Sequence, residues 1–270
     1  MIISVRDHFR ELAIDAGKSL LRHTVQLYST TNIKKPCPIC SGVLLAYKDY
    51  RFLVSAAHLV KGFSPNSLAV YVKDTLHIPV GNAVIADPRE SKINNETDVI
   101  VWRLKDEVAN DLEKQYEFYS PTETSFNHSV SDKIQYLVVG FPNSKTHANP
   151  NTHKIKQDPF IYLAKQSDLK YYQLLRLQEA RNLLLDYDRE NIKNFKTDQV
   201  QTGPWPEGLS GCGIWFLPNP LATKVEDIHS ALVGILIEFW DEHNVIVSTR
   251  LSVALQLLEK AASETAPNIT

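Results

Sequence analysis

Three short segments carry a histidine, an aspartate and a serine, residue types that can together perform nucleophilic catalysis. His58 closes the segment SAAH at 55–58, directly after the strand-like run RFLV. Asp98 opens the run DVIVWRL, and Ser210 lies in the segment GLSG at 208–211. A serine hydroxyl is a weak nucleophile until a neighbouring base removes its proton. We therefore expect chemistry at a serine if the fold brings the three side chains together.

The three segments, in this order, resemble the signatures of the trypsin/chymotrypsin-like serine proteases, which are TAAH, a D-[IV]-[AV]-[LV] strand and G-x-S-G-G. Separations of 40 residues from His58 to Asp98 and of 112 from Asp98 to Ser210 suit that family. Further similar motifs occur between about residues 23 and 258: SGVL at 41–44, VGFP at 139–142, ALVGI at 231–235 and VSTRL at 247–251. The resemblance implies a hydrolase, a bacterial serine protease of the intracellular type.

The resemblance also implies a role for each residue of a catalytic triad. His58 would be the general base and then the general acid, and Asp98 would fix its tautomer. Ser210 would be the nucleophile, and the backbone N–H groups of Gly208 and Ser210 would form an oxyanion hole, at about 3 kcal/mol per donor. Glycine at 208 suits an unusual backbone dihedral.

One alternative concerns the aspartate. Asp87 and Glu96 are carboxylates of the same loop region as Asp98. A carboxylate at the start of a strand can also be no more than an exposed, hydrated group.

A substrate pocket is implied by the residues before Ser210 and by the strand after Gly234. These positions hold Trp205, between two prolines, and then Ile237, Glu238 and Phe239. Bulky Phe239 and Ile246 lie about where trypsin has pocket glycines. We therefore expect a shallow or gated pocket instead of a deep one for basic side chains.

The bulk composition is that of an ordinary soluble globular protein, with 270 residues, 43% hydrophobic and 22% charged. A formal net charge of −2 gives no indication of a nucleic-acid or membrane partner. Charges in the first residues and the lack of a long uncharged apolar window argue against a secretory signal or a membrane span. We expect a cytoplasmic protein that acts on a protein or peptide substrate, and a regulatory protein partner is compatible with the sequence.

The chain has three cysteines, Cys37, Cys40 and Cys212. This small odd number argues against a disulfide framework. The spacing CPIC at 37–40 is that of half a zinc site, but no second C-x-x-C is present. We expect no metal and no cofactor. Cys212, which stands where the family has its second glycine after the serine, is predicted to be a small core residue.

The segments around these residues predict the elements that position them. Short β-rich runs recur from about residue 21, with turn residues between them, which favours an all-β, antiparallel fold. The resemblance implies two six-stranded Greek-key barrels, with short N- and C-terminal helices. We expect a helix at 1–20 that stops near Gly17, a first barrel at 21–120 with His58 and Asp98, and a second barrel at 121–270 with Ser210. A helical insertion is predicted near 165–181.

The resulting functional hypothesis is a serine endopeptidase that forms an acyl-enzyme intermediate, with regulated cleavage or a defence role as its setting. The alternative is a catalytically silent protease-fold module for binding or scaffolding, which Cys212 and the crowded pocket favour. An α/β-hydrolase esterase is disfavoured, because its triad order is Ser, Asp, His and a helix follows its serine.

Overall fold

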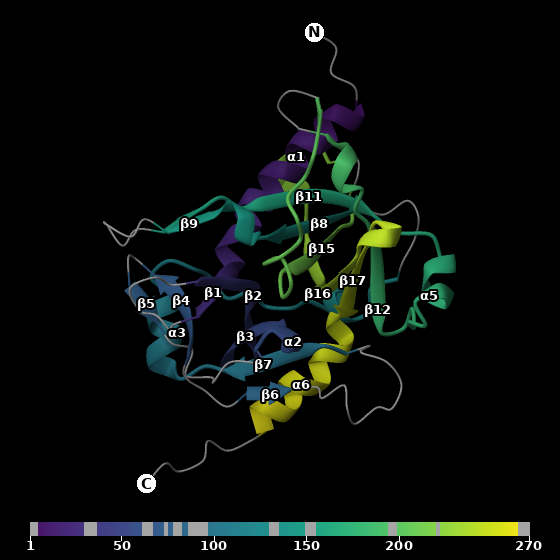
Figure 1. Cartoon of the computed structure of the whole chain (residues 1–270). Coiled ribbons are helices and arrows are strands. Elements are labelled where there is room, and N and C mark those ends of the chain that lie inside the picture. The colour runs from purple at the N-terminus through teal and green to yellow at the C-terminus, as the bar shows by residue number, and fades with distance from the viewer. Residues whose placement is uncertain are drawn as a thin grey trace.

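The chain is described by a computed structural model that covers residues 5–29, 37–60, 67–72, 75–77, 83–85, 97–129, 135–148, 155–193, 199–219 and 222–263. Two large sheets form most of it, with one helix at each end of the molecule (Figure 1). Neighbouring strands in both sheets are antiparallel. The predicted β-rich, antiparallel class is therefore confirmed.

The first sheet contains seven strands in the order β5-β4-β1-β2-β3-β7-β6. Most of its strands are rich in Val, Leu, Ile and Tyr, whose side chains pack well on a pleated surface. Their bounds are Thr24–Ser29 (β1), Cys37–Tyr47 (β2), Tyr50–Ala56 (β3), Leu68–Val72 (β4), Thr75–His77 (β5), Ala83–Ile85 (β6) and Val99–Arg103 (β7).

The second sheet contains six strands in the order β11-β8-β15-β16-β17-β12. Their bounds are Gln135–Gly140 (β8), Phe160–Lys165 (β11), Asn182–Asp186 (β12), Gly213–Leu217 (β15), Ala231–Trp240 (β16) and Val245–Arg250 (β17). The two outermost strands meet at one isolated antiparallel bridge, between Gln166 and Leu185. Two small hairpins lie beside this sheet: Thr146–Ala148 (β9) with Ile155–Gln157 (β10), and Ile192–Lys193 (β13) with Val200–Gln201 (β14).

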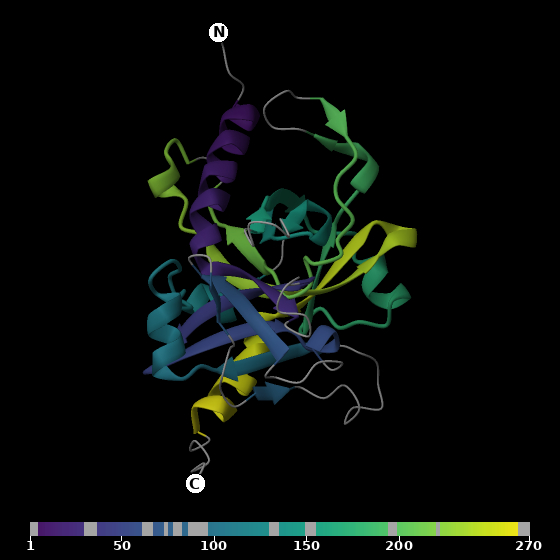
Figure 2. The same ribbon diagram turned by 60° about the vertical axis from the view of Figure 1, so that its left-hand side comes forward.

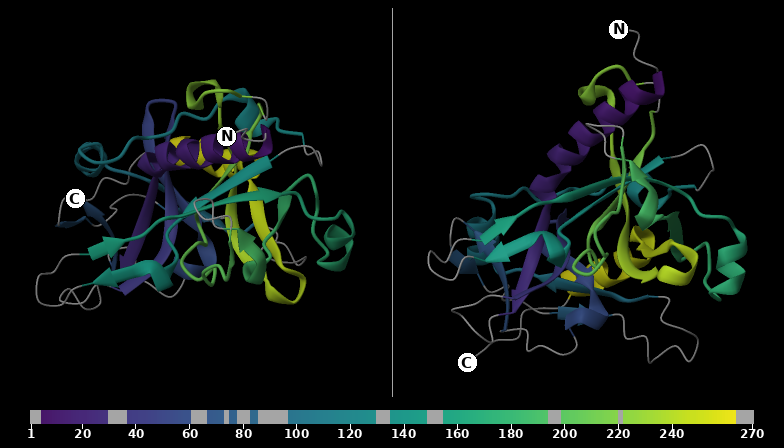
Figure 3. Two further views of the ribbon diagram at one scale, coloured as in Figure 1. Left: turned by 90° about the horizontal axis from the view of Figure 1, so that it is seen from above. Right: turned by 45° about the horizontal axis from the view of Figure 1, so that its top comes forward.

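The longest helices lie at opposite ends of the molecule (Figures 1 and 2). The N-terminal one, α1 (Val5–Leu20), packs on β8 and β11, and seen from above it runs across the strands (Figure 3). The C-terminal one, α6 (Leu251–Ser263), packs on β6, β7 and β16. Shorter helices are Ala57–Val60 (α2), Asp106–Leu112 (α3), Glu123–Phe126 (α4) and Lys170–Leu174 (α5), with 3₁₀ turns at Leu21–His23, Asn143–Lys145, Arg189–Asn191, Val225–Asp227 and Asp241–His243.

The predicted N-terminal helix ends at Leu20, within its predicted range of 1–20, but the expected stop near Gly17 is wrong. The helix α1 does not stop at Gly17 but continues to Leu20, and a Cβ at Gly17 would lie 2.5 Å from Ile161 of β11. Glycine there permits a close approach of helix to strand. The segment where a helical insertion was predicted, near 165–181, connects β11 to β12 and contains the short helix α5. This helix ends before Arg176, whose left-handed φ of 54° is incompatible with a continued α-helix.

One buried cluster joins the two sheets. It contains Val43 and Val54 of the first sheet together with Leu137 and Trp215 of the second. Tyr119, between the sheets in sequence, adds a polar link, because its backbone bonds to β2 and its hydroxyl accepts the N–H of Leu232 in β16 at 3.3 Å. The halves that carry His58 and Ser210 are thus packed together through a shared core.

Candidate active site

Strand pairing brings Asp98 beside His58. The strand β3 ends at Ala56, which pairs with Val99 at the start of β7, so the residue before β7 lies next to the first turn of α2. The backbone closes this junction, since the N–H of Ala57 donates to the carbonyl oxygen of Asp98 at 3.0 Å.

The carboxylate of Asp98 holds His58 through both of its oxygens. Oδ1 accepts the backbone N–H of His58 at 2.8 Å, and Oδ2 is hydrogen-bonded to Nδ1 of the imidazole. An ionised carboxylate can only accept, so this bond places a proton on Nδ1 and leaves Nε2 as the basic nitrogen. Asp98 is buried and hydrogen-bonded to His58, so it is not the exposed, hydrated carboxylate that the alternative described. Asp87 and Glu96 lie outside the described residues.

The residues around Ser210 form a tight turn before β15. The N–H of Leu209 donates to the carbonyl of Pro206 at 2.8 Å, and the N–H of Cys212 donates to the carbonyl of Leu209 at 2.9 Å. Gly208 has a φ of +92°, as its glycine suggested, and Gly211 has a φ of +88°. Only glycine adopts such angles without strain.

Close packing also demands glycine in this turn. A Cβ at Gly208 would lie 2.3 Å from Oδ1 of Asn143, and a Cβ at Gly211 would lie 2.1 Å from the carbonyl oxygen of Ser41. The sequence GLSG is therefore fixed at both glycines by backbone angle and by space.

The N–H groups of Gly208 and Ser210 are oriented by the carbonyl groups on the same peptide planes. The carbonyl of Glu207 accepts the N–H of Asn143 at 2.8 Å, and that of Leu209 accepts the N–H of Cys212. In a trans peptide the N–H points opposite to the C=O. Within the described chain, neither the Gly208 nor the Ser210 amide donates a hydrogen bond. Both residues line the cavity that contains His58.

That cavity, called here the His58 cavity, has a volume of about 720 Å³. It brings together the predicted triad and the predicted pocket residues. Its lining residues are Ile39, His58, Asp98, Asn143, Trp205, Pro206, Glu207, Gly208, Ser210, Leu236, Ile237, Glu238, Phe239 and Asp241. Among described residues, the Ser210 hydroxyl has no hydrogen-bond partner. Catalytic hydrogen bonds are often long before substrate binds.

The wall of the pocket includes Trp205, whose ring lies against the guanidinium of Arg189. Trp205 is 48% exposed, and the guanidinium of Arg189 lies 4.0 Å from its ring centre. The hydroxyl of Tyr187 donates to the carbonyl of Pro204 at 2.6 Å, which fixes the loop that carries Trp205. Phe239 and Ile246 were both expected to fill the pocket. Phe239 lines the cavity, whereas Ile246 is fully buried and does not line it, so only Phe239 narrows the pocket directly.

Sequence reasoning missed two residues of this region. Asn143 lines the cavity and its backbone N–H donates to the carbonyl of Glu207, in the turn around Ser210. Its signal in the sequence was the VGFP motif that ends at the preceding residue. Asp241, at the far end of β16, lines the cavity as a third carboxylate beside Glu207 and Glu238. None of these three carboxylates forms an ion pair with a described residue.

All three cysteines are free thiols, and none takes part in this site. Cys212 is buried, as predicted, and burial raises its pKa well above the usual range. Cys40 is also buried, with its Sγ 3.5 Å from Oγ of Ser55, and burial raises its pKa to about 12. Cys37 is exposed. In the described chain, no three His, Cys, Asp or Glu side chains are grouped as metal ligands.

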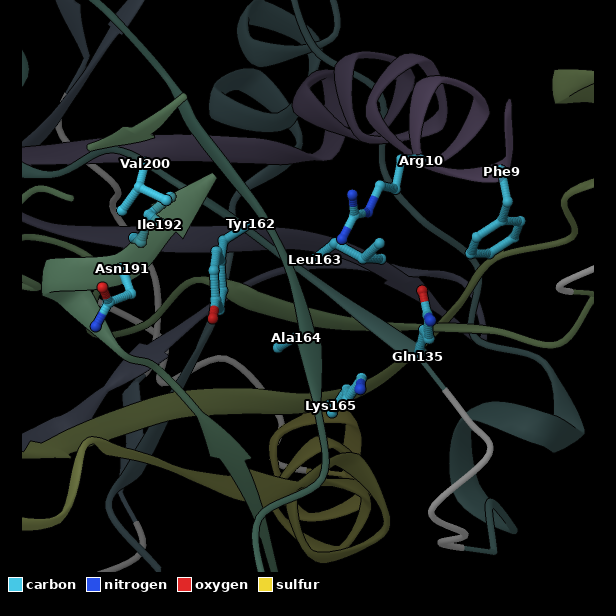
Figure 4. A pocket seen from close by; sticks show the side chains of 10 residues that line it. All are labelled: Phe9, Arg10, Gln135, Tyr162, Leu163, Ala164, Lys165, Asn191, Ile192 and Val200. Carbon is cyan, nitrogen blue, oxygen red and sulfur yellow. The ribbon is translucent and has the colours of Figure 1, made fainter. Parts of the chain in front are cut away.

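A second cavity, of about 350 Å³, lies between α1, β11 and the β13–β14 hairpin (Figure 4). Arg10 reaches from α1 toward Leu163, and Tyr162 and Lys165 come from the same strand as Leu163. It shares no lining residue with the His58 cavity and has no serine, cysteine or histidine in its wall. His58 and Ser210 therefore have no counterpart in this second cavity.

No protein-family model matches the chain, and no curated protein matches it. None of the helices in the described ranges is long and apolar enough to cross a membrane.

Proposed function

We propose that the chain is a serine endopeptidase in which Ser210, His58 and Asp98 form the catalytic triad. One observation carries the proposal: the carboxylate of Asp98 orients the imidazole of His58 in the cavity that also contains Ser210. A binding module has no use for a buried carboxylate bonded to Nδ1 of a histidine beside a serine turn. The amides of Gly208 and Ser210, which donate no hydrogen bond to any described residue, add support.

The proposed reaction has two halves. Nε2 of His58 takes the proton from Oγ of Ser210 as Oγ bonds to the peptide carbonyl carbon, and the amides of Gly208 and Ser210 donate to the oxyanion. The C–N bond then breaks, and His58 protonates the leaving amine. In the second half His58 deprotonates a water molecule, which attacks the acyl ester. The acid product leaves, and Ser210 regains its proton.

We also propose that the two sheets are the two Greek-key barrels of the chymotrypsin-like fold. If the antiparallel pair of β4 and β5 is counted as a single position, each half has six positions that can be numbered in chain order. The order across the first sheet is then 4-1-2-3-6-5, and that across the second is 2-1-4-5-6-3. These are the same cyclic order opened at two places. The Gln166–Leu185 bridge joins strands 2 and 3 of the second half, which supports closure there.

The substrate in this proposal is a protein or peptide. The open β16 edge supports it, because β15 pairs with β16 only as far as Ile235, while Ile237, Glu238 and Phe239 continue along the cavity. An extended peptide can add to such an edge through backbone hydrogen bonds. Cytoplasmic location and a regulated role remain parts of the proposal.

A fluorophosphonate probe tests the proposal directly. Its phosphorus forms a bond to an activated serine oxygen as fluoride leaves, so intact mass reports one added group. We expect labelling of the wild type and none of Ser210→Ala, with His58→Ala and Asp98→Asn strongly slowed. Ser19→Ala, which removes a hydroxyl that bonds only within α1, is the matched control and should label like the wild type.

Two results would contradict the proposal, one the assignment of Ser210 and the other catalysis itself. Labelling that persists in Ser210→Ala would assign the reactive group elsewhere. A folded wild type that does not label would favour the silent binding module. If the wild type does label, a further experiment distinguishes a peptidase from an esterase. The wild type is incubated with a denatured protein mixture, and mass spectrometry identifies any new termini.

A further inference from the structure

Ser41 is a fully buried residue of β2 that binds the turn around Ser210 from the other half of the molecule. Its backbone N–H donates to the carbonyl of Ser210 at 3.0 Å, and its Oγ donates to the carbonyl of Gly208 at 2.8 Å. The sequence separation from Ser41 to Gly208 is 167 residues. Ser41 does not line the His58 cavity, so it has no contact with a substrate there.

The direction of the Ser41 hydroxyl proton is fixed by its neighbours. Oγ also lies 2.9 Å from the backbone nitrogen of Phe141, which can only donate. The single hydroxyl proton therefore goes to the carbonyl of Gly208. A Cβ at Gly140 would lie 3.1 Å from this oxygen, so the glycine of the VGFP motif leaves room for the hydroxyl.

The hydrogen bonds of Ser41 complete a set of four. Four consecutive carbonyl groups, those of residues 207–210, accept hydrogen bonds, from Asn143 N–H, Ser41 Oγ, Cys212 N–H and Ser41 N–H in turn. Every peptide plane from residue 207 to 211 is thereby oriented. The planes held by Ser41 alternate with the planes that carry the Gly208 and Ser210 amides.

We infer that Ser41 is a positioning residue, whose hydroxyl holds the Gly208 carbonyl toward the buried interior so that the Gly208 and Ser210 amides face the oxyanion position. This inference rests on the proposed function. Without the hydroxyl, the buried carbonyl of Gly208 and the N–H of Phe141 lose their partner. The peptide plane between Gly208 and Leu209 can then rotate about the flexible glycine. That rotation disturbs the adjoining plane, which carries the Gly208 amide.

The test compares Ser41→Ala with Ser41→Thr, which keeps the hydroxyl, and with Ser41→Cys, which fills the space with a weak donor. Ser248→Ala is the matched control, because Ser248 is equally buried and donates to a backbone carbonyl, that of Leu183, at 2.7 Å. Fluorophosphonate labelling at several probe concentrations separates the maximal rate from the half-saturating concentration. Hydrogen–deuterium exchange of the peptide covering residues 203–213 reports the turn without any need for activity.

We expect Ser41→Ala to lower the maximal labelling rate about 100-fold, the loss associated with one oxyanion donor. The half-saturating concentration and the pH at half-maximal rate should stay near wild type, because Asp98 and His58 are untouched. Ser41→Thr should restore the rate, Ser41→Cys should be intermediate, and Ser248→Ala should leave it unchanged. Exchange in 203–213 should rise in Ser41→Ala and not in Ser248→Ala.

Unchanged exchange of the turn in Ser41→Ala would overturn the inference, and so would faster exchange with an unchanged labelling rate. A wild type that never labels refutes the proposed function instead. The exchange data then still decide whether Ser41 holds the turn.

Discussion

The carboxylate of Asp98 is sheltered from water, whereas the imidazole of His58 that it binds is open to the cavity. The Asp98 side chain is 9% exposed and the His58 side chain 43% exposed. The imidazole also cannot swing away freely, because the same carboxylate holds the His58 backbone N–H in the first turn of α2. One residue thus fixes both the tautomer and the position of the His58 imidazole.

Replacing this carboxylate gives the first prediction. In Asp98→Asn an amide N–H can face Nδ1, which favours the proton on Nε2 and removes the base. We expect kcat to fall about 10⁴-fold with a small change in KM. Steady-state kinetics with an unfolding curve checks this. A decrease of less than about tenfold in a folded variant would show that Asp98 does not orient the catalytic base.

The two glycines around Ser210 give the second prediction. Gly211→Ala places a methyl group 2.1 Å from the carbonyl oxygen of Ser41 at a φ of +88°. We expect a loss of more than about 2 kcal/mol in the free energy of unfolding, together with lost activity. Gly234→Ala is the control, because its nearest contact is 3.1 Å and its φ is ordinary. Equal losses in the two variants would contradict the described turn.

His128 gives a prediction about pH. Burial, and then the positive charge of Arg250, lower the pKa of His128 from 6.5 to about 4. The unfolded chain therefore binds more protons than the folded chain between pH 6.5 and pH 4. The free energy of unfolding should therefore fall as the pH falls through this window.

Urea unfolding at pH 7 and pH 4.5 measures the effect. His128→Gln, which does not titrate, should show a smaller drop than the wild type. The same drop in both proteins would mean that His128 is protonated in the folded state. The hydrogen bond of Nε2 to the hydroxyl of Tyr136, at 2.8 Å, is the contact that the glutamine can partly replace.

Trp205 gives a prediction about binding. Since its exposed ring forms part of the cavity wall and it supplies none of the proposed triad or oxyanion groups, Trp205→Ala should raise KM about tenfold and leave kcat nearly unchanged. Trp205→Phe should recover most of the affinity. A large loss of kcat in Trp205→Ala would place the ring in the chemistry instead.

The carboxylates of Glu207, Glu238 and Asp241 give a prediction about salt. Their like charges at the cavity repel acidic substrates, and salt screens exposed charges. For a peptide with acidic residues next to the cleaved bond, kcat/KM should rise between 20 mM and 500 mM salt. Glu238→Gln should show a smaller rise. No salt dependence for either protein would exclude an electrostatic role of this carboxylate.

The strands and the candidate catalytic residues could be recognised from short segments of the sequence. Runs such as DVIVWRL predicted β7 because a short, continuous run of β-branched and aromatic residues can be recognised without knowledge of its distant partner. His58, Asp98 and Ser210 could be chosen because each lies in a short motif. What the sequence could not give was the partner of each group, since Ser41 and Gly208 meet only after the two halves pack.

Tertiary packing also overrode local signals in α1. Glycine is a residue type at which helices often end, yet α1 continues through Gly17 to Leu20. At this position the glycine serves packing, because Ile161 occupies the space that a side chain would fill. Such a contact between residues 144 positions apart leaves no trace in either local segment.

The two terminal helices each cover strands of the opposite half. The helix α1 precedes the first sheet but packs on β8 and β11, and α6 follows the second sheet but packs on β6 and β7. Cutting the chain between Phe126 and Gln135 would therefore produce two fragments, each carrying the cover that the other lacks. Each fragment would lack one helix that covers its sheet, so we expect the two fragments to associate, and fluorophosphonate labelling at Ser210 would report the reassembled protein.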